Sequence, residues 1–187
     1  MTTKQFTLVA LGAASLSMTV ATAHSFPTQP TLVDVVRAAT ERFRDPDRAI
    51  AEGYAPMPSC VTGPEEGAMG VHYVDGNLVG DGELTSERPE ALVYEVKDGR
   101  IRLVAVEYIV VADAWNANHP SPPVLLGQQF HYVGSPNRYG IPAFYELHVW
   151  AWRQNPKGTF VDWNPRVSCD EFVVDDSMHS HAAHDRR

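Results

Sequence analysis

The sequence contains little cysteine and no concentration of positive charge. Among its 187 residues only Cys60 and Cys169 are cysteines, and 15 Lys and Arg face 23 Asp and Glu, for a net charge of -8. Without a basic stripe, the chain is not expected to bind nucleic acid or an anionic membrane. It also lacks a phosphate-binding loop, a Gly-x-Ser-x-Gly elbow and a reactive-cysteine motif, which disfavours nucleotide binding and serine or cysteine hydrolysis.

Long hydrophobic runs are also missing, apart from one near the N-terminus. The apolar run at Phe6–Val20 is interrupted by Gly12 and by serines, and it is too short for a good membrane-spanning helix. Lys4 precedes the run, and residues 21–23 (Ala-Thr-Ala) match a signal-peptidase site. We therefore predict a signal peptide at 1–23 and a secreted or periplasmic protein with no membrane span after cleavage. The alternatives are an N-terminal anchor or an unstructured terminus.

The two cysteines are far apart, and no CxxC pair is present, which argues against a cysteine-bound metal. In an oxidising compartment an even number of cysteines is typical of a disulfide, so we predict a bond between Cys60 and Cys169. Closing a loop of about 100 residues stabilises the fold by roughly 4–5 kcal/mol as an upper figure.

The remaining chain has the length of one domain. A proline-punctuated linker is predicted at 24–30, a single domain at 31–175 and a disordered tail at 176–187 that contains His179, His181 and His184. These tail histidines could scavenge metal. Cleavage after Ala23 would also leave His24 as a new N-terminus, whose amine and imidazole could chelate copper.

Helical periodicity precedes strand periodicity in this domain. Apolar residues at helical spacing between Leu32 and Phe43 follow Thr31, a good N-cap, and Asp45 can cap a second helix through Ala51, with Ala49 and Ile50 facing inward. Strands are predicted at 69–74, 91–96, 100–111, 124–133, 144–152 and 159–163, with a turn at 75–77 and loops at 54–67 and 112–123. This order predicts an α+β fold with N-terminal helices packed on a curved antiparallel β-sheet or partial β-barrel.

Two of the apolar strands carry ionisable residues. Strand alternation places Glu146 and His148 on one face of 144–152. In 100–111 it places Glu107 on the face that also holds Ile101, Leu103, Ala105 and Ile109. A carboxylate in such surroundings must be protonated, paired with a basic group or bound to a cation.

We therefore predict a metal site formed by His72, Glu107 and His148. Two imidazoles and a carboxylate suit a divalent transition metal such as Zn, Fe, Mn or Cu and leave positions open for water or substrate. Glu146 and His131 are candidate catalytic residues, as a fourth ligand, an orienting partner or a proton relay. The alternative is that the histidines are hydrogen-bonded core residues and that Glu107 pairs with an arginine, for which the candidates are Arg102, Arg138 and Arg153.

Several short motifs resemble those of a family of exported, largely uncharacterised bacterial proteins. The principal ones are Met-Gly-Val-His-Tyr at 69–73, Val-Ala-Val-Glu-Tyr at 104–108 and Glu-Leu-His-Val-Trp at 146–150, followed by Asn155-Pro156. Further similarity lies at 49–54 and 89–94, so the resemblance covers nearly the whole mature domain. It implies a common fold and draws attention to the three predicted ligands, but it carries over no established activity.

These features predict an exported metal-binding protein and leave three functions open. One is a mononuclear metalloenzyme, hydrolytic or oxygen-dependent, with a small-molecule substrate. A second is a non-catalytic module that holds a small apolar ligand in an aromatic-lined cavity. Its candidate lining residues are Trp150, Trp152 and Trp163. A third is a structural envelope protein. The sequence leaves the oligomeric state open.

Overall fold

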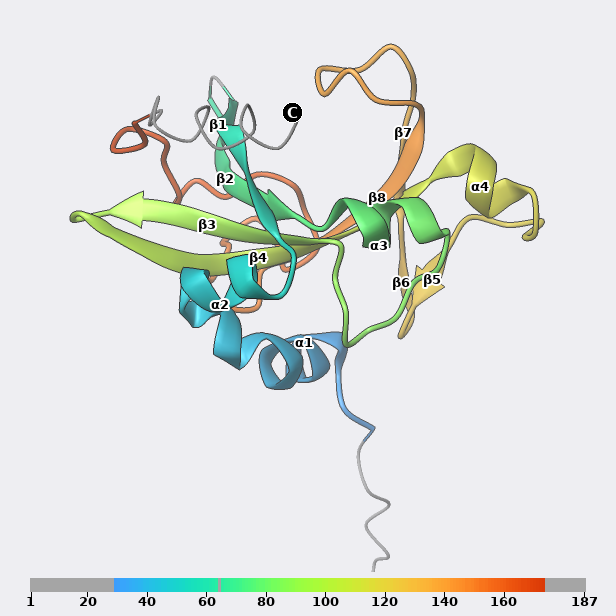
Figure 1. Cartoon of the computed structure of the whole chain (residues 1–187), viewed down its shortest axis with the longest axis horizontal. Coiled ribbons are helices and arrows are strands. Elements are labelled where there is room, and N and C mark those ends of the chain that lie inside the picture. Colours follow the sequence, from blue (N-terminus) through green and yellow to red (C-terminus); the bar gives the residue numbers. More distant parts are fainter. Residues whose placement is uncertain (1–28, 64, 174–187) are drawn as a thin grey trace, which may run out of the picture.

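The computed structural model describes residues 29–63 and 65–173. The predicted signal peptide, most of the linker, His24 and the histidine-containing tail lie outside the described residues. Within them, N-terminal helices pack against a six-stranded antiparallel sheet that curls strongly, as Figure 1 shows. The predicted α+β fold on a curved sheet is therefore confirmed.

The N-terminal helices are α1 (Leu32–Thr40), a 3-10 turn (Glu41–Arg44) and α2 (Pro46–Ala51). The Thr31 hydroxyl accepts a hydrogen bond from the Asp34 N–H, and the Asp34 carboxylate accepts one from the Thr31 N–H, which forms a capping box. Asp45 caps α2 as predicted. Ala49 is buried, but Ile50 is 51% exposed, because consecutive helical residues point about 100° apart and only one can face the sheet.

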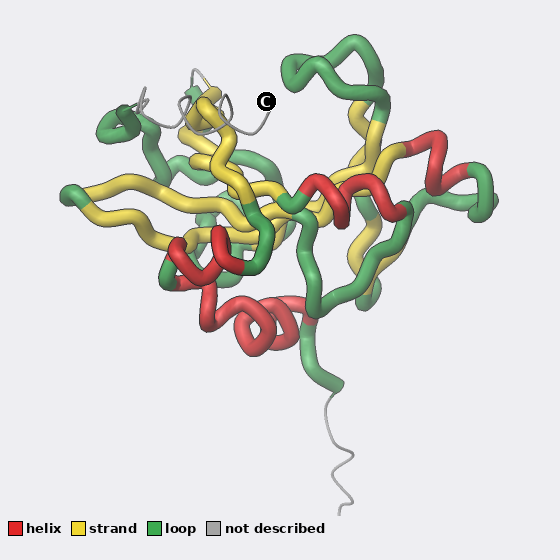
Figure 2. The backbone as a smooth tube through the Cα atoms, viewed as in Figure 1, coloured by secondary structure: helices red, strands yellow, loops and turns green. Residues whose placement is uncertain are grey.

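The main sheet has the strand order β1-β2-β3-β4-β8-β7, and all of its neighbours are antiparallel. Its strands are β1 (Ala55–Gly63), β2 (Gly67–Val74), β3 (Ala91–Lys97), β4 (Arg100–Val111), β7 (His131–Val133) and β8 (Phe144–Val149). A separate two-stranded sheet comprises β5 (Val124–Leu125) and β6 (Gln128–Gln129), and the short helices are α3 (Gly76–Asp81) and α4 (Ala112–Asn116). Figure 2 shows how these short elements flank the main sheet.

Several predicted boundaries are wrong. The expected loop at 54–67 contains β1, an edge strand, where prolines are tolerated because one side needs no ladder hydrogen bonds. The expected strand at 124–133 is divided by a turn in which Leu126 and Gly127 both have positive φ. Residues 75–77 begin a helix instead of a simple turn, α4 lies in the expected loop at 112–123, and 159–163 is not a strand.

The two faces of the sheet have different roles. One face packs under α1 and α2 and forms the main hydrophobic core, with large side chains such as Tyr94, Tyr108 and Leu147. The opposite face carries the predicted metal ligands. A bulge in the β3–β4 pairing, where the register steps from Ala105 to Leu103, turns Leu103 into the main core. The prediction that Leu103 shares a face with Glu107 is therefore wrong.

Cys60 of β1 and Cys169 form a disulfide with an S–S distance of 2.01 Å, which confirms the predicted pairing. The bond joins the edge strand β1 to the segment that follows β8. Among the helices of the described ranges, none is both long and apolar enough to cross a membrane.

Gly70 in β2 is a position where a larger residue should destabilise the fold strongly. Its φ is +122°, and an added Cβ would lie 2.5 Å from the Tyr94 carbonyl oxygen. We expect Gly70→Ala to lower the free energy of unfolding by about 2–4 kcal/mol, because it combines backbone strain with a clash against backbone. Urea denaturation measures the change. Gly76→Ala is the control, since an added Cβ there meets nothing within 4 Å; equal losses in both variants would contradict this explanation.

Candidate metal centre

The strand register brings two of the predicted ligands face to face. Glu107 of β4 lies directly opposite His148 of β8 in the antiparallel ladder. His72 of β2 lies opposite Val93 of β3, so one strand separates it from β4. All three side chains project from the face that does not carry α1 and α2, and all three residues are buried.

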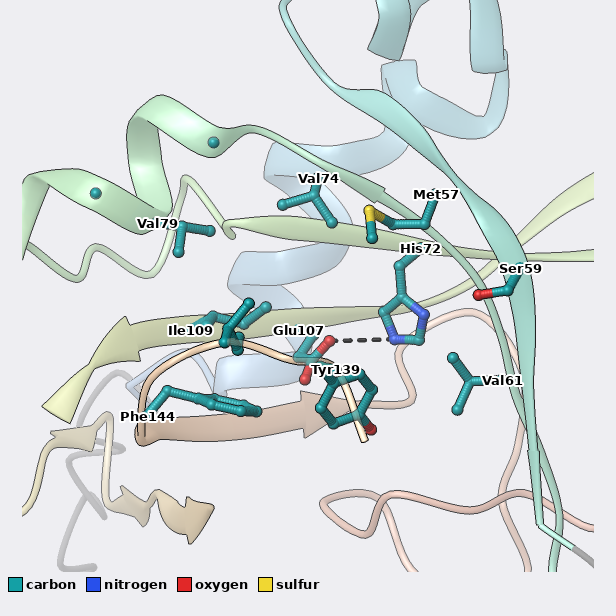
Figure 3. A pocket seen from close by; sticks show the side chains of 13 residues that line it. Met57, Ser59, Val61, His72, Val74, Val79, Glu107, Ile109, Tyr139 and Phe144 are labelled. Atoms are coloured by element: carbon teal, nitrogen blue, oxygen red, sulfur yellow. Dashed lines mark ion pairs between the residues drawn. The ribbon is translucent and has the colours of Figure 1, made fainter. Parts of the chain in front are cut away.

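The curl of the sheet closes the distance between β2 and β4. Two strands that flank a third are about 9–10 Å apart in a flat sheet. On β3, Val93 lies opposite His72 and Ala91 lies opposite Glu107, so the His72–Glu107 contact crosses this strand diagonally. Figure 3 shows both side chains pointing toward each other across the intervening strand.

The three residues form a compact donor set. His72 Nε2 lies 3.1 Å from Glu107 Oε2, and His148 Nδ1 lies 3.9 Å from Glu107 Oε1. One candidate ligand atom from each residue lies within 4.8 Å of the others. Ligands on a tetrahedral ion with bonds of about 2.0–2.1 Å are roughly 3.3 Å apart, so small side-chain adjustments suffice. The buried His72–Glu107–His148 group can therefore hold a metal ion, and the predicted proximity of these residues is confirmed.

Unpaired polar atoms also fit a cation at this place. Both ring nitrogens of His148, Glu146 Oε2 and Asp162 Oδ1 are buried and have no hydrogen-bond partner among the described residues. Each such atom costs about 1–3 kcal/mol if it is left unsatisfied. A metal ion would bind a ring nitrogen of His148 and attract the nearby carboxylate oxygens. Ordinary packing does not explain why these polar atoms are buried together without partners.

Burial disfavours the charged forms of the ligands in the metal-free protein. It lowers the pKa of His72 to about 4 and lowers the pKa of His148 well below its usual value. It also raises the pKa of Glu107 to about 7. A bound cation would favour ionised Glu107, while the neutral imidazoles are already in the form that binds metal.

Glu146, a predicted catalytic residue, lies beside the group. Its side chain shares a hydrogen bond with Glu107, and burial together with the Glu107 charge raises its pKa to about 9. His131 lies opposite Glu146 in the β7–β8 ladder, but its side chain is 54% exposed. Glu146 is therefore in direct contact with a ligand, whereas His131 is outside the compact group.

Asp162 connects His131 to the group, and sequence reasoning missed it. Its Oδ1 lies 3.6 Å from His131 Nδ1 and 3.8 Å from His148 Nδ1. Burial raises the pKa of Asp162. The residue lies in an irregular segment after β8, where no periodicity indicates which way a side chain points. An aspartate inside a run of Phe, Val and Trp was the available signal.

The three arginines named as alternative partners of Glu107 are paired elsewhere. Arg102 pairs with Asp98, Arg138 donates to the Thr62 carbonyl, and Arg153 donates to the Arg166 carbonyl. No Arg or Lys among the described residues forms an ion pair with Glu107. The indoles of Trp150 and Trp152 donate to Val161 O and Thr40 Oγ1 as part of the packing.

A cavity of about 340 Å³ opens directly beside the candidate ligands. His72 and Glu107 belong to its lining, whereas His148 does not. Its walls come from β1, β2, α3, β4, the loop before β8 and the start of β8, and they are mostly aliphatic, with Tyr139 and Phe144 as the phenyl-ring members. The three tryptophans suggested as lining residues are not part of the lining of this cavity.

Glu90, at the start of β3, is a further buried carboxyl group. It accepts a hydrogen bond of 2.9 Å from the Ile109 N–H, and burial raises its pKa to about 8. The folded state therefore retains a proton that the unfolded state loses above its normal pKa of 4.5. It follows that this group makes the protein less stable as pH rises from about 4.5 to 8 and has no further effect outside that window.

We expect Glu90→Gln to remove this dependence, because the amide oxygen can still accept from Ile109. Relative to wild type, the variant should gain about 2–4 kcal/mol between pH 5 and pH 8. Denaturation at these two pH values in the presence of a chelator measures the difference. Glu83→Gln, at an exposed position nearby, should show no such gain. The prediction would be contradicted if the free energy of unfolding changed equally with pH in Glu90→Gln and in wild type.

Comparisons of the chain with protein-family models, with curated proteins and with solved structures found no match. The geometry of the buried His72–Glu107–His148 group is therefore the main indication of function.

Proposed function

We propose that the protein is exported and binds one divalent transition metal ion through His72, Glu107 and His148. We further propose that this centre catalyses a reaction of a small molecule. The main supporting observation is that three strands bring one donor atom from each residue within 4.8 Å of the others in a buried setting. Two imidazoles and one carboxylate leave coordination positions open, as catalytic sites require.

A divalent ion bound here would supply Lewis acidity for hydrolysis or, in the case of iron, a binding site for dioxygen. The chain contributes the surroundings. His72 and Glu107 line the cavity. His148 completes the group of three ligands from a position outside the lining. Glu146 shares a hydrogen bond with Glu107 and is placed to hold or deliver a proton. Asp162 Oδ1 lies 3.8 Å from His148 Nδ1, the same nitrogen that faces Glu107, and so adds a carboxylate oxygen beside the proposed ion.

A purely structural role explains these observations less well. Buried histidines that serve packing normally have hydrogen-bond partners, yet both nitrogens of His148 have none among the described residues. The disulfide and the leader-like N-terminus are compatible with export. The motifs that resemble exported bacterial proteins include all three proposed ligands, but the resemblance carries over no established activity.

A second candidate function, a non-catalytic module for a small apolar ligand, is favoured by the aliphatic walls of the cavity. The two candidates differ in the need for metal. The module would bind its ligand equally well after metal removal, whereas the proposed enzyme would not.

Elemental analysis of the natively exported protein tests the proposal. We expect about one transition metal ion per chain in wild type and loss of that ion in His72→Ala. His119→Ala is the matched control, because this imidazole is exposed and stacks on Trp115 at 3.7 Å, apart from the group. Substoichiometric metal in wild type, or unchanged metal in His72→Ala, would refute the proposed function.

A further inference from the structure

We infer that the molecule bound at this centre is small, uncharged and mostly hydrocarbon, with one hydroxyl or carbonyl oxygen directed at the His72–Glu107 side of the metal. This inference rests on the proposed function and adds the class of substrate. It follows from the shape, lining and charge of the cavity in Figure 3.

The buried ionisable groups of the lining lie together. His72 and Glu107 stand side by side, and Figure 3 draws the His72 Nε2–Glu107 Oε2 contact of 3.1 Å. Around them stand aliphatic side chains, among which Val61, Val79 and Ile109 come from three different elements. A molecule in this space therefore has one place for an oxygen donor and apolar contacts along the rest of its surface.

The lining excludes charged substrates. No Lys or Arg is among the residues that line the cavity, so a phosphate or sulfonate would lose hydration without gaining a counter-charge apart from the ion. The only acidic lining residue is Glu107, which is committed to the metal, so a cationic ligand would have no free partner either. Both signs of charge are therefore disfavoured.

The lining also excludes substrates rich in hydroxyl groups, such as sugars. Ser59 at an exposed position and Tyr139 are the uncharged side chains with hydroxyl groups in the lining. The Tyr139 hydroxyl is directed to the Met69 sulfur at 3.7 Å. A sugar would leave most of its hydroxyl groups without partners at about 1–3 kcal/mol each.

The size of the cavity limits the ligand further. Its volume of about 340 Å³ is near the lower end of the range of about 300–1,000 Å³ for small-molecule pockets. Met57 and Ile141, which are 47% and 37% exposed, belong to the lining and provide apolar surface accessible from solvent. A monocyclic or short-chain molecule fits these limits.

The test uses the mature protein loaded with Co²⁺, whose visible spectrum reports on coordination, and calorimetry with three probes. Thymol has an apolar ring and one hydroxyl, cymene lacks the hydroxyl, and p-hydroxybenzoate keeps the hydroxyl but carries a carboxylate in place of the alkyl groups. We expect thymol to bind and to change the Co²⁺ spectrum. Cymene should bind at least about tenfold more weakly without a spectral change, and p-hydroxybenzoate should bind at least about tenfold more weakly than thymol.

Variants at Val79 locate the binding site without touching a metal ligand. Val79→Phe adds bulk to the cavity wall, whereas Val79→Ala removes some, and both should retain one Co²⁺ per chain. We expect Val79→Phe to weaken thymol binding at least about tenfold and Val79→Ala to change it much less. Equal affinity of both variants for thymol would overturn the location of the site.

The outcomes separate the two proposals. Failure to load Co²⁺ would refute the proposed function before any probe is added. Normal loading combined with a preference for p-hydroxybenzoate would overturn only the inferred substrate class. Equal thymol affinity with and without Co²⁺ would overturn the role of the oxygen head group. A dimer that dissociates when thymol is added would show that a second copy of the chain occupies the cavity, which would also overturn the inference.

Discussion

Replacing His148 with phenylalanine is expected to lower the affinity for Zn²⁺ by at least about 100-fold and to stabilise the metal-free protein by about 1–3 kcal/mol. Affinity falls because a ligand is lost, and loss of even an outer-shell partner costs 10–100-fold in metal sites. Stability rises because both buried ring nitrogens, which lack partners among the described residues, disappear while a ring remains in the same space. Zn²⁺ titration and urea denaturation in chelator measure the two effects.

His119→Phe is the control for both measurements, since His119 is exposed and lies in the loop after α4, outside the sheet. It should change neither Zn²⁺ affinity nor stability by more than about 0.5 kcal/mol, as is usual for surface substitutions. Unchanged Zn²⁺ affinity in His148→Phe would show that His148 is not a ligand. A loss of stability in the metal-free variant would show that its imidazole has a structural partner.

Removing the disulfide by replacing both Cys60 and Cys169 with alanine is expected to lower the free energy of unfolding by about 4 kcal/mol. The two cysteines are 109 residues apart in the sequence, so the bond restricts a long loop of the unfolded chain. Guanidinium denaturation measures the change. Wild type treated with reductant should approach the stability of the variant, and the variant itself should be insensitive to reductant. Equal stability of wild type with and without reductant would contradict the prediction.

The disulfide variant also tests whether metal binding and ligand binding depend on the same strands. The ligands come from β2, β4 and β8, whereas β1, which carries Cys60, supplies Met57, Ser59 and Val61 to the cavity wall. Under conditions where the variant is folded, we expect metal content to stay near one ion per chain while thymol affinity falls. Parallel loss of metal and thymol binding would show that the edge strand supports the ligands as well.

Local patterns in the sequence were sufficient where one short segment determines the structure. Thr31 and Asp34 form the cap because their spacing matches the first turn of a helix. The β3–β4 hairpin turns at Asp98 and Gly99, where both residues have positive φ. Burial of Glu107 and His148 follows from the apolar strands around them, and such burial requires a partner for each. These predictions depend on periods of 3.6 and 2 residues that the chain displays directly.

Irregular segments could not be predicted in the same way. Asp162 approaches His148 only because the chain after β8 turns back over the sheet, and no repeat pattern records that path. The strand β1 was obscured by Pro56 and Pro58, which an edge strand tolerates. The bulge that turns Leu103 toward the main core interrupts the alternation from which its face was predicted. In each case the decisive interaction joins residues that are distant in sequence.

The sequence by itself determined the helix-then-strand order, the single cysteine pair and the three residues suited to bind a metal. Composition and short-range periodicity are sufficient for these properties. Only the tertiary structure decided that His72 reaches Glu107 across β3, because that contact needs the curvature of the sheet. It also decided that an aliphatic cavity opens beside His72 and Glu107, since its walls come from strands, a helix and a loop that meet only in the folded chain.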